Sequence, residues 1–261
     1  MEIFEATTIE VTADGARGTI MLNRPDKLNP LGTGTLNELI AAARWFDARP
    51  EVKVVVIGGR GRAFSAGADL AAFVDPADDA AATREAADAG RRMADAVEAM
   101  GAVTIARLHG HCVGGGLVLA AACDLRVAAD TVRFSIPEVD LGIPLAWGGI
   151  PRLVREIGPA LTKELVMTCR PFGAQEAKAA GFVNTVVSED GLDDEVERLV
   201  AQLITKSALT LGLTKRHTNA VAEGMVGTAR SFSDADGLLT ALHDPESRDA
   251  AAAYLSRVQR G

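Results

Sequence analysis

Three consecutive glycines, residues 114–116, join a short apolar segment to an apolar run and are the most informative feature of this sequence. Glycine tolerates the tight turns and close backbone approaches that such a junction needs. If a helix begins at the end of the run, its first N–H groups have no intrahelical partner and can donate to an anion or an oxyanion. A purely structural turn fits the same residues, because closely packed backbones also favour glycine.

A second glycine-containing turn, residues 58–70, follows the strand-like segment 52–57. Two such turns can direct N–H groups at one carbonyl oxygen. Neither turn has the Gly-x-x-x-x-Gly-Lys-Ser/Thr pattern of a phosphate loop, and residues 113–119 lack the spacing of a dinucleotide site. The pair of turns therefore favours an oxyanion site over a nucleotide site.

Glu138 lies within a mostly apolar segment, residues 134–144. Desolvation there raises the pKa of a carboxyl group toward values useful for acid–base chemistry. Asp140 is more simply explained as a structural loop residue. His109 and His111 have no third ligand at metal spacing, so we expect them to be structural and expect no metal site. The sequence also lacks the Gly-x-Ser-x-Gly elbow of serine hydrolases.

Composition limits the class of protein. The chain has 261 residues, of which 48% are hydrophobic and 24% charged, as expected for a soluble globular protein with a full core. A formal charge of −8 argues against nucleic acid and anionic membranes as partners. Three widely spaced cysteines indicate reduced buried thiols, and no segment resembles a signal peptide or a membrane span. We therefore expect a cytoplasmic protein.

Hydrophobic periodicity predicts an α/β chain that becomes mostly helical after about residue 147. We expect an opening hairpin, then alternating strands and helices, with residues 75–79 at the start of a helix that follows a loop and ends near residue 99. The expected strands are residues 7–12, 18–23, 52–57, 104–108, 123–128 and 183–187. The expected helices are residues 34–48, 71–99, 116–122, 147–157, 159–169, 174–180, 192–204, 208–223 and two segments within 234–257.

Three motifs, taken together and in order, resemble the enoyl-CoA hydratase/isomerase (crotonase) superfamily. They are Ala-Phe-Ser-Ala-Gly-Ala-Asp-Leu at residues 63–70, His-Gly-x-x-x-Gly-Gly-Gly at 109–116 and Phe-Ser-Ile-Pro-Glu-Val-Asp-Leu-Gly-Ile-Pro at 134–144. The resemblance implies a crotonase-like spiral of repeated ββα units, residues 1–190, that carries the acyl-CoA site. It implies a helical C-terminal region, residues 191–261, that builds a homotrimer or a hexamer formed as a dimer of trimers.

The same resemblance implies roles for individual residues. The N–H groups of Ala68 and Gly115 would form the oxyanion hole, and Glu138 would be the catalytic acid and base. Coenzyme A would enter as part of the thioester substrate, without a permanently bound cofactor. The substrate-binding positions would be Arg24, Lys27, Ala66, Gly114 and Val118. Residues 243–249 depart from the usual ending of the family, which leaves the last coenzyme A contacts open.

One departure bears on the reaction. Hydratases of this superfamily carry two glutamates, and the position of the first is occupied here by Val118, whose side chain cannot activate water. A single carboxylate favours double-bond isomerisation over hydration. Other enolate reactions, such as decarboxylation or C–C cleavage, and a non-catalytic acyl-CoA binding protein stay open as alternatives.

Overall fold

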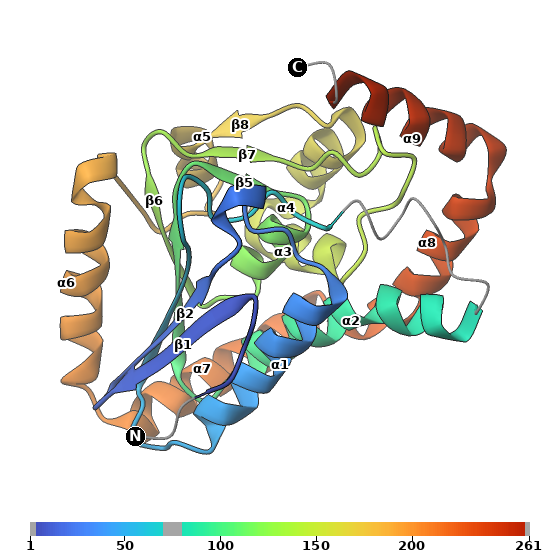
Figure 1. Ribbon diagram of the computed structural model, residues 1–261. Helices are drawn as coiled ribbons and strands as arrows, with labels where there is room; N and C mark the ends of the chain where they lie inside the picture. Colours follow the sequence, from blue (N-terminus) through green and yellow to red (C-terminus); the bar gives the residue numbers. More distant parts are fainter. Residues whose placement is uncertain (1–3, 70–79, 259–261) are drawn as a thin grey trace.

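The computed structural model describes residues 4–69 and 80–258 (Figure 1). The helix start expected at residues 75–79 lies outside the described residues. A six-stranded sheet has the order β1-β2-β3-β4-β6-β9, and a smaller sheet has the order β5-β7-β8. The strands of the large sheet are β1 (Ile9–Asp14), β2 (Arg17–Leu22), β3 (Val54–Gly59), β4 (Val103–Leu108), β6 (Leu125–Ala129) and β9 (Thr185–Val187).

The opening hairpin is confirmed, because β1 and β2 pair antiparallel with Ile9 opposite Leu22. The next strand, β3, differs from its expected bounds. It begins two residues later than expected and continues through Gly58 and Gly59, which pair with the end of β2. These two glycines were expected in the following turn. They extend the strand because they pair with Met21 and Leu22 of β2. Gly59 has no room for a side chain, since a Cβ there would lie 2.4 Å from the carbonyl oxygen of Ala63.

The ββα repeat comes from strands that step from the large sheet to the small one. The chain runs from β4 through β5 (His111–Val113) to α3 (Gly115–Ala121), and again from β6 through β7 (Arg133–Ser135) to α4 (Gly149–Thr168). Between β4 and β5 the step is made at Gly110, with φ of 58°, where a side chain would meet the carbonyl oxygen of Arg62. The predicted spiral is therefore confirmed. The two short strands β5 and β7 were not expected.

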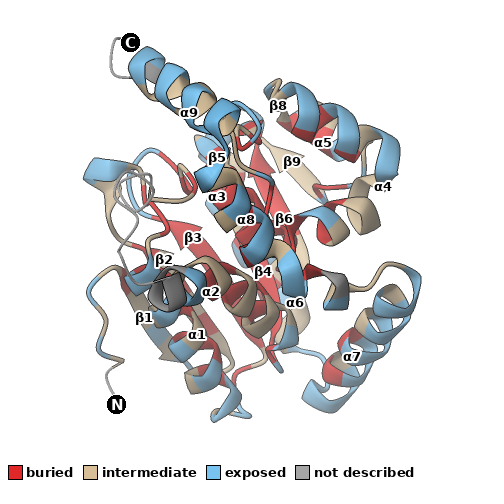
Figure 2. Ribbon diagram, turned by 90° about the vertical axis from the view of Figure 1, so that its right-hand side faces the viewer, coloured by how far each residue is buried: buried red, intermediate tan, exposed pale blue. Residues whose placement is uncertain are grey.

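Helices cover both faces of the large sheet. The helix α6 (Leu192–Ile204) packs on one face against Val54, Ile105 and other strand residues. The opposite face is covered by α1 (Thr33–Asp47), α2 (Ala80–Ala99) and α3, whose apolar residues belong to the main core. Figure 1 shows α6 standing apart from α1 and α2 across the sheet, and Figure 2 shows the central strands buried between the layers.

The second half contains most of the helices, as expected. Gly158, with φ of 75°, interrupts α4 ahead of Pro159, which accounts for the two segments expected there. The short β8 (Phe172–Gly173) and α5 (Ala174–Ala179) precede β9. The last helices are α7 (Ala208–Met225), α8 (Asp234–His243) and α9 (Pro245–Val258). In the part of the chain that the structure describes, none of the helices is sufficiently long and apolar for a membrane span.

The C-terminal helices are not all remote from the spiral core. Helix α8 packs against α2, and Arg84 forms an ion pair with Asp236 at 2.9 Å. Along α7, by contrast, four large apolar side chains are exposed: Leu209, Leu213, Val221 and Met225. The division at residue 190 and the assembly into trimers or hexamers stay predictions.

Candidate active site

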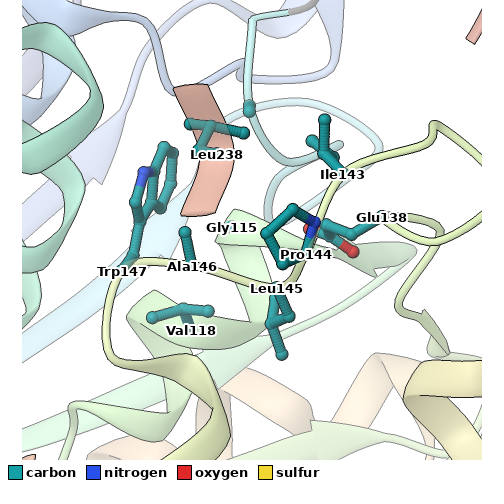
Figure 3. A pocket seen from close by; sticks show the side chains of 10 residues that line it. Gly115, Val118, Glu138, Ile143, Pro144, Leu145, Ala146, Trp147 and Leu238 are labelled. Carbon is teal, nitrogen blue, oxygen red and sulfur yellow. The ribbon is translucent and has the colours of Figure 1, made fainter. Parts of the chain in front are cut away.

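A small cavity lies where the glycine turns, the loop after β7 and α8 meet (Figure 3). In the figure, Glu138 and Trp147 lie on opposite sides of it, with Val118 below and Leu238 above. Among the described residues, Glu138 is the only charged side chain in the wall. The lining residues are Ala68, Gly115, Val118, Glu138, Ile143, Pro144, Leu145, Ala146, Trp147 and Leu238.

Glu138 follows β7 in a compact turn, where its carbonyl oxygen accepts a hydrogen bond of 2.9 Å from the N–H of Ile143. The residue is 8% exposed, and its Oε2 atom has no hydrogen-bond partner among the described residues. Burial raises the pKa of this carboxyl group to about 7. A carboxyl group with this pKa is present in both protonation states near neutral pH, so it can accept a proton and return it.

The raised pKa of Glu138 has a consequence for stability. The carboxyl group of Glu138 has its ordinary pKa of 4.5 in the unfolded chain and a pKa of about 7 in the folded chain. The stability associated with the protonated carboxyl is therefore fully present below pH 4.5 and is lost as the pH rises through about 7. One pKa unit corresponds to about 1.4 kcal/mol, so we expect a loss of roughly 3 kcal/mol in the free energy of unfolding between about pH 4 and pH 8.

Urea unfolding of the wild type and of Glu138→Gln at several pH values measures this loss. Glutamine has nearly the same shape and does not ionise, so the variant should lack this component and become more stable than the wild type above pH 7. The difference between the two proteins isolates Glu138 from all other titrating groups. A difference that does not change with pH contradicts the expectation.

The two glycine turns meet at this cavity. In the first turn, Ala68 forms a parallel β-bridge with Leu31. The N–H of Leu31 donates to the carbonyl of Gly67 at 2.8 Å, and the carbonyl of Leu31 accepts from the N–H of Asp69 at 3.4 Å. This pairing leaves the Ala68 N–H directed away from Leu31. In the second turn, Gly115 opens α3. Within the described residues neither the Ala68 nor the Gly115 N–H has a hydrogen-bond acceptor.

The two turns approach each other closely at glycine positions, where a side chain would not fit. A Cβ at Gly67 would lie 3.5 Å from the nitrogen of Gly115, and a Cβ at Gly116 would lie 2.8 Å from Cβ of Ser65. The hydroxyl of Ser65 donates to the Asn29 carbonyl at 2.8 Å and accepts from the Gly67 N–H at 3.1 Å. Ser65 therefore holds the first turn in shape.

Asn29 lies in the same loop as Arg24 and Lys27 and is almost completely buried. Its side-chain amide donates to the carbonyls of Arg60 and Ala63 at 2.9 Å, and its Oδ1 accepts from the Arg24 N–H at 2.9 Å. Asn29 thus ties its own loop to the first glycine turn. Its contribution to a ligand site is to position its neighbours.

The remaining substrate-binding candidates divide into two groups. Gly114 and Val118 lie at the cavity: Val118 is part of the wall, and a Cβ at Gly114 would lie 2.3 Å from Oε1 of Glu138. Arg24, Lys27 and Ala66 lie outside the lining residues. Arg24 is half-buried and pairs with Asp69 at 3.3 Å, Lys27 is exposed, and Ala66 is half-buried beside the first turn.

The histidines have the structural setting that the sequence predicts for them. The Nε2 of His109 lies 2.8 Å from the Gly61 carbonyl and its Nδ1 lies 3.0 Å from the Arg107 guanidinium, which fits a neutral ring that donates from Nε2. Burial lowers the pKa of His109. Over the described ranges, no cluster of His, Cys, Asp or Glu could hold a metal ion. Asp140 is exposed and lies 3.8 Å from Arg257.

Sequence reasoning missed Trp147 and Leu238, both of which line the cavity. Trp147 precedes Gly148 and Gly149, and this pair of glycines after an aromatic residue was a signal of a special turn. Leu238 lies on α8, far along the chain, and nothing in its local sequence distinguishes it from a core leucine. Its place at the cavity follows from the packing of α8 on α2.

The sequence model of one family, described as enoyl-CoA hydratase/isomerase, matches residues 14–260. The chain belongs to this family. It is 35% identical over 240 residues to a crotonyl-CoA hydratase of Syntrophomonas wolfei subsp. wolfei, covering 91% of each chain. It is also 29% identical over 255 residues to a short-chain-enoyl-CoA hydratase of Clostridium acetobutylicum, covering 97% of this chain and 96% of that one.

Solved structures of enoyl-CoA hydratases have the same fold. One from Mycobacterium avium subsp. paratuberculosis has a TM-score of 0.85 at 27% identity, covering 97% of each chain. One from Geobacillus kaustophilus has a TM-score of 0.78 at 35% identity, covering 97% of this chain and 96% of that one. The protein is therefore an enzyme of the enoyl-CoA hydratase/isomerase family that acts on acyl-CoA thioesters.

Proposed function

We propose that this enzyme shifts the double bond of an enoyl-CoA thioester from the C3–C4 position to the C2–C3 position, using Glu138 as its only acid and base. The observation that carries the proposal is the composition of the cavity wall, in which Glu138 is the one charged side chain among the described residues. Val118 occupies the same wall and is fully buried. One carboxylate suffices for a proton shuttle, because the same oxygen can release the proton that it accepted.

In the proposed reaction, the ionised Glu138 removes a proton from C2 of a 3-enoyl thioester. The electron pair moves into the conjugated system and onto the thioester oxygen, which gives a dienolate. Glu138 then returns the proton to C4, so the C3–C4 double bond is lost and a C2–C3 double bond forms. No other reactant enters or leaves.

The N–H groups of Ala68 and Gly115 would stabilise the oxygen of this dienolate. Fixed donors placed where negative charge develops contribute about 3–4 kcal/mol each in a water-excluded site. The assignment is supported by two N–H groups that lack acceptors in the described chain and by the apolar residues around them. Because backbone amides donate, the turn geometry matters here more than the identity of the side chains.

The ends of the substrate need other contacts. We propose that Arg24 and Lys27 attract the phosphates of coenzyme A, since both lie in one loop beside the first glycine turn. Ala66 and Gly114 would leave room for the thioester as it passes toward Glu138. The cytoplasm as location and the trimer or hexamer as assembly belong to the same proposal.

Hydration is the second candidate function, and the names of the relatives from Syntrophomonas wolfei and Clostridium acetobutylicum favour it. Addition of water requires a group that holds and activates the water molecule beside the acid. A valine side chain offers no hydrogen bond for that purpose. If Val118 lines the site as proposed, hydration would depend on Glu138 alone.

A labelled substrate tests the proposal. We expect 3-hexenoyl-CoA carrying two deuterium atoms at C2 to give 2-hexenoyl-CoA with one deuterium transferred to C4, because in the proposed reaction the same carboxylate removes the deuterium and returns it while the substrate covers the cavity. Chromatography and mass spectrometry identify the product. 2-Hexenoyl-CoA is incubated in parallel, because water adds only to the conjugated isomer. Formation of 3-hydroxyhexanoyl-CoA from 2-hexenoyl-CoA favours the hydratase alternative. Tight binding of both thioesters without turnover favours a binding protein or an enzyme for another enolate reaction, such as decarboxylation or C–C cleavage, for which neither thioester is a substrate.

A further inference from the structure

Trp147 lines both the reaction cavity and a second cavity, which we call the distal cavity. The distal cavity lies between α1, α2 and α8, and Leu36, Ala87 and Leu242 are among its walls. Both cavities share Ala68, Trp147 and Leu238. The reaction cavity has a volume of about 30 Å³ and the distal cavity one of about 70 Å³. The distal cavity is therefore the larger of the two, and the indole ring borders it.

Two glycines on different helices make room for this ring. A Cβ at Gly90 of α2 would lie 2.0 Å from Cδ2 of Trp147, and a Cβ at Gly115 of α3 would lie 2.2 Å from its Cζ3. The indole thus fills a slot that any other residue at Gly90 or Gly115 would close. The side chain is held there, since Trp147 is only 8% exposed.

The backbone of Trp147 is also fixed in an unusual conformation. Its φ of 62° is left-handed, a conformation that residues other than glycine rarely adopt. The guanidinium of Arg152 donates to the carbonyls of Trp147 and Gly148, at 3.4 and 3.3 Å. The Gly148 N–H donates to Asp234 at 2.8 Å, so α4 and α8 both hold the turn.

Arg152 is itself anchored on α2. It is 1% exposed, and its guanidinium contacts Glu98 at 2.5 Å and Asp95 at 2.9 Å. Removing one partner of a buried ion pair is strongly destabilising, so this network holds its geometry firmly. The wall formed by Trp147 is therefore rigid, with supports on three helices.

We propose that Trp147 determines the acyl-chain length of the substrate by closing the reaction cavity against the distal cavity. This inference rests on the acyl-CoA binding of the proposed function. A short acyl chain ends at the indole ring, whereas a longer chain needs space that the ring occupies. Without the ring, an apolar tail extends between α1, α2 and α8 and contacts Leu36, Ala87 and Leu242.

Binding of saturated thioesters tests this inference. We expect Trp147→Gly to raise the affinity for octanoyl-CoA relative to butyryl-CoA at least about tenfold over the wild-type ratio, measured by titration calorimetry. Each methylene moved from water into apolar space contributes about 0.8 kcal/mol, or about fourfold in affinity. Glycine suits the left-handed backbone of this position. Trp147→Leu keeps an apolar core residue and should raise the same ratio by a smaller factor.

A double variant makes the test specific for the distal cavity. Adding Ala87→Leu to Trp147→Gly refills that cavity from α2 and should return the ratio toward its wild-type value. An unchanged ratio in both folded single variants overturns the inference, as does a wild-type enzyme that already prefers octanoyl-CoA as strongly. Thermal unfolding establishes which variants are folded, and the leucine variant decides the matter if the glycine variant is not.

Saturated thioesters cannot isomerise or add water, so this experiment does not depend on the reaction. If neither thioester binds to the wild type, the acyl-CoA site itself is wrong and the proposed function fails with the inference. If both bind and the ratio does not respond to Trp147, only the inference fails.

Discussion

Glu138→Gln is expected to lower kcat/KM for the interconversion of 3-enoyl-CoA and 2-enoyl-CoA by about 10³- to 10⁴-fold. A positioned acid–base group contributes about 10²- to 10⁴-fold, and here one group performs both proton transfers. Glutamine fills the same space and leaves both glycine turns intact, so KM should change little. Steady-state kinetics with purified product isomers measures both parameters.

The pH dependence of kcat/KM in the wild type tests the role of Glu138 independently. Because the pKa of Glu138 is raised to about 7, kcat/KM should fall about tenfold for each pH unit below that value and level off above it. Asp140→Asn is the matched control, since that carboxylate is exposed and lies beside Arg257. It should stay within about twofold of the wild type. Full activity in Glu138→Gln would remove Glu138 from the mechanism.

The placement of Glu138 could be predicted because its cause is local. The residues that flank it in the sequence are mostly apolar, which indicates burial, and burial is the main cause of its raised pKa. The glycine turns could be predicted for a similar reason. A glycine such as Gly114, with φ of 49°, adopts a backbone conformation that other residues avoid, so the glycine itself indicates a turn at that point of the sequence.

Strand ends and short strands were harder to predict. The strands β5 and β7 have three residues each, which is too few for a periodic pattern. They form because they pair with each other in the smaller sheet, with His111 opposite Arg133. The extension of β3 through Gly58 and Gly59 similarly depends on β2. Such features depend on strands that are distant in the chain, so they cannot be predicted from the residues nearby in the sequence.

Two residues of the cavity wall, Trp147 and Leu238, could not be placed there from the sequence. Leu238 reaches the cavity because α8 packs on α2, and Trp147 forms a wall because Gly90 and Gly115 leave a slot for it. Each of these contacts joins segments far apart in the sequence. The proposed catalytic residues could be predicted because they lie in the turns themselves, whereas the residues that shape the space around them depend on tertiary packing.

Gly114→Ala is expected to lower kcat/KM for isomerisation by about 10²-fold or more and to destabilise the fold by about 1–3 kcal/mol. The left-handed φ of 49° at Gly114 excludes most side chains, and strain of this kind costs about 1–3 kcal/mol. The added Cβ would lie 2.3 Å from Oε1 of Glu138, so the carboxylate must move. Displacing a catalytic group by about 1 Å is enough for about a 10²-fold loss.

Gly34→Ala is the control for the substitution itself. Gly34 lies in α1, and a Cβ there would meet nothing within 4 Å. Replacing a helical glycine by alanine stabilises by about 1 kcal/mol, so this variant should be at least as stable as the wild type and fully active. Urea unfolding and steady-state kinetics of both variants at a temperature where both are folded separate lost activity from lost structure.

The double variant Glu138→Gln with Gly114→Ala shows whether Gly114 acts through Glu138. If alanine reduces activity by moving the carboxylate, it has nothing further to disturb once glutamine has replaced that group. The two losses should then be far from additive, with the double variant close to Glu138→Gln alone. Additive losses would mean that alanine acts elsewhere, most directly on the N–H of Gly115, and that the close contact between Gly114 and Glu138 is not what positions the carboxylate.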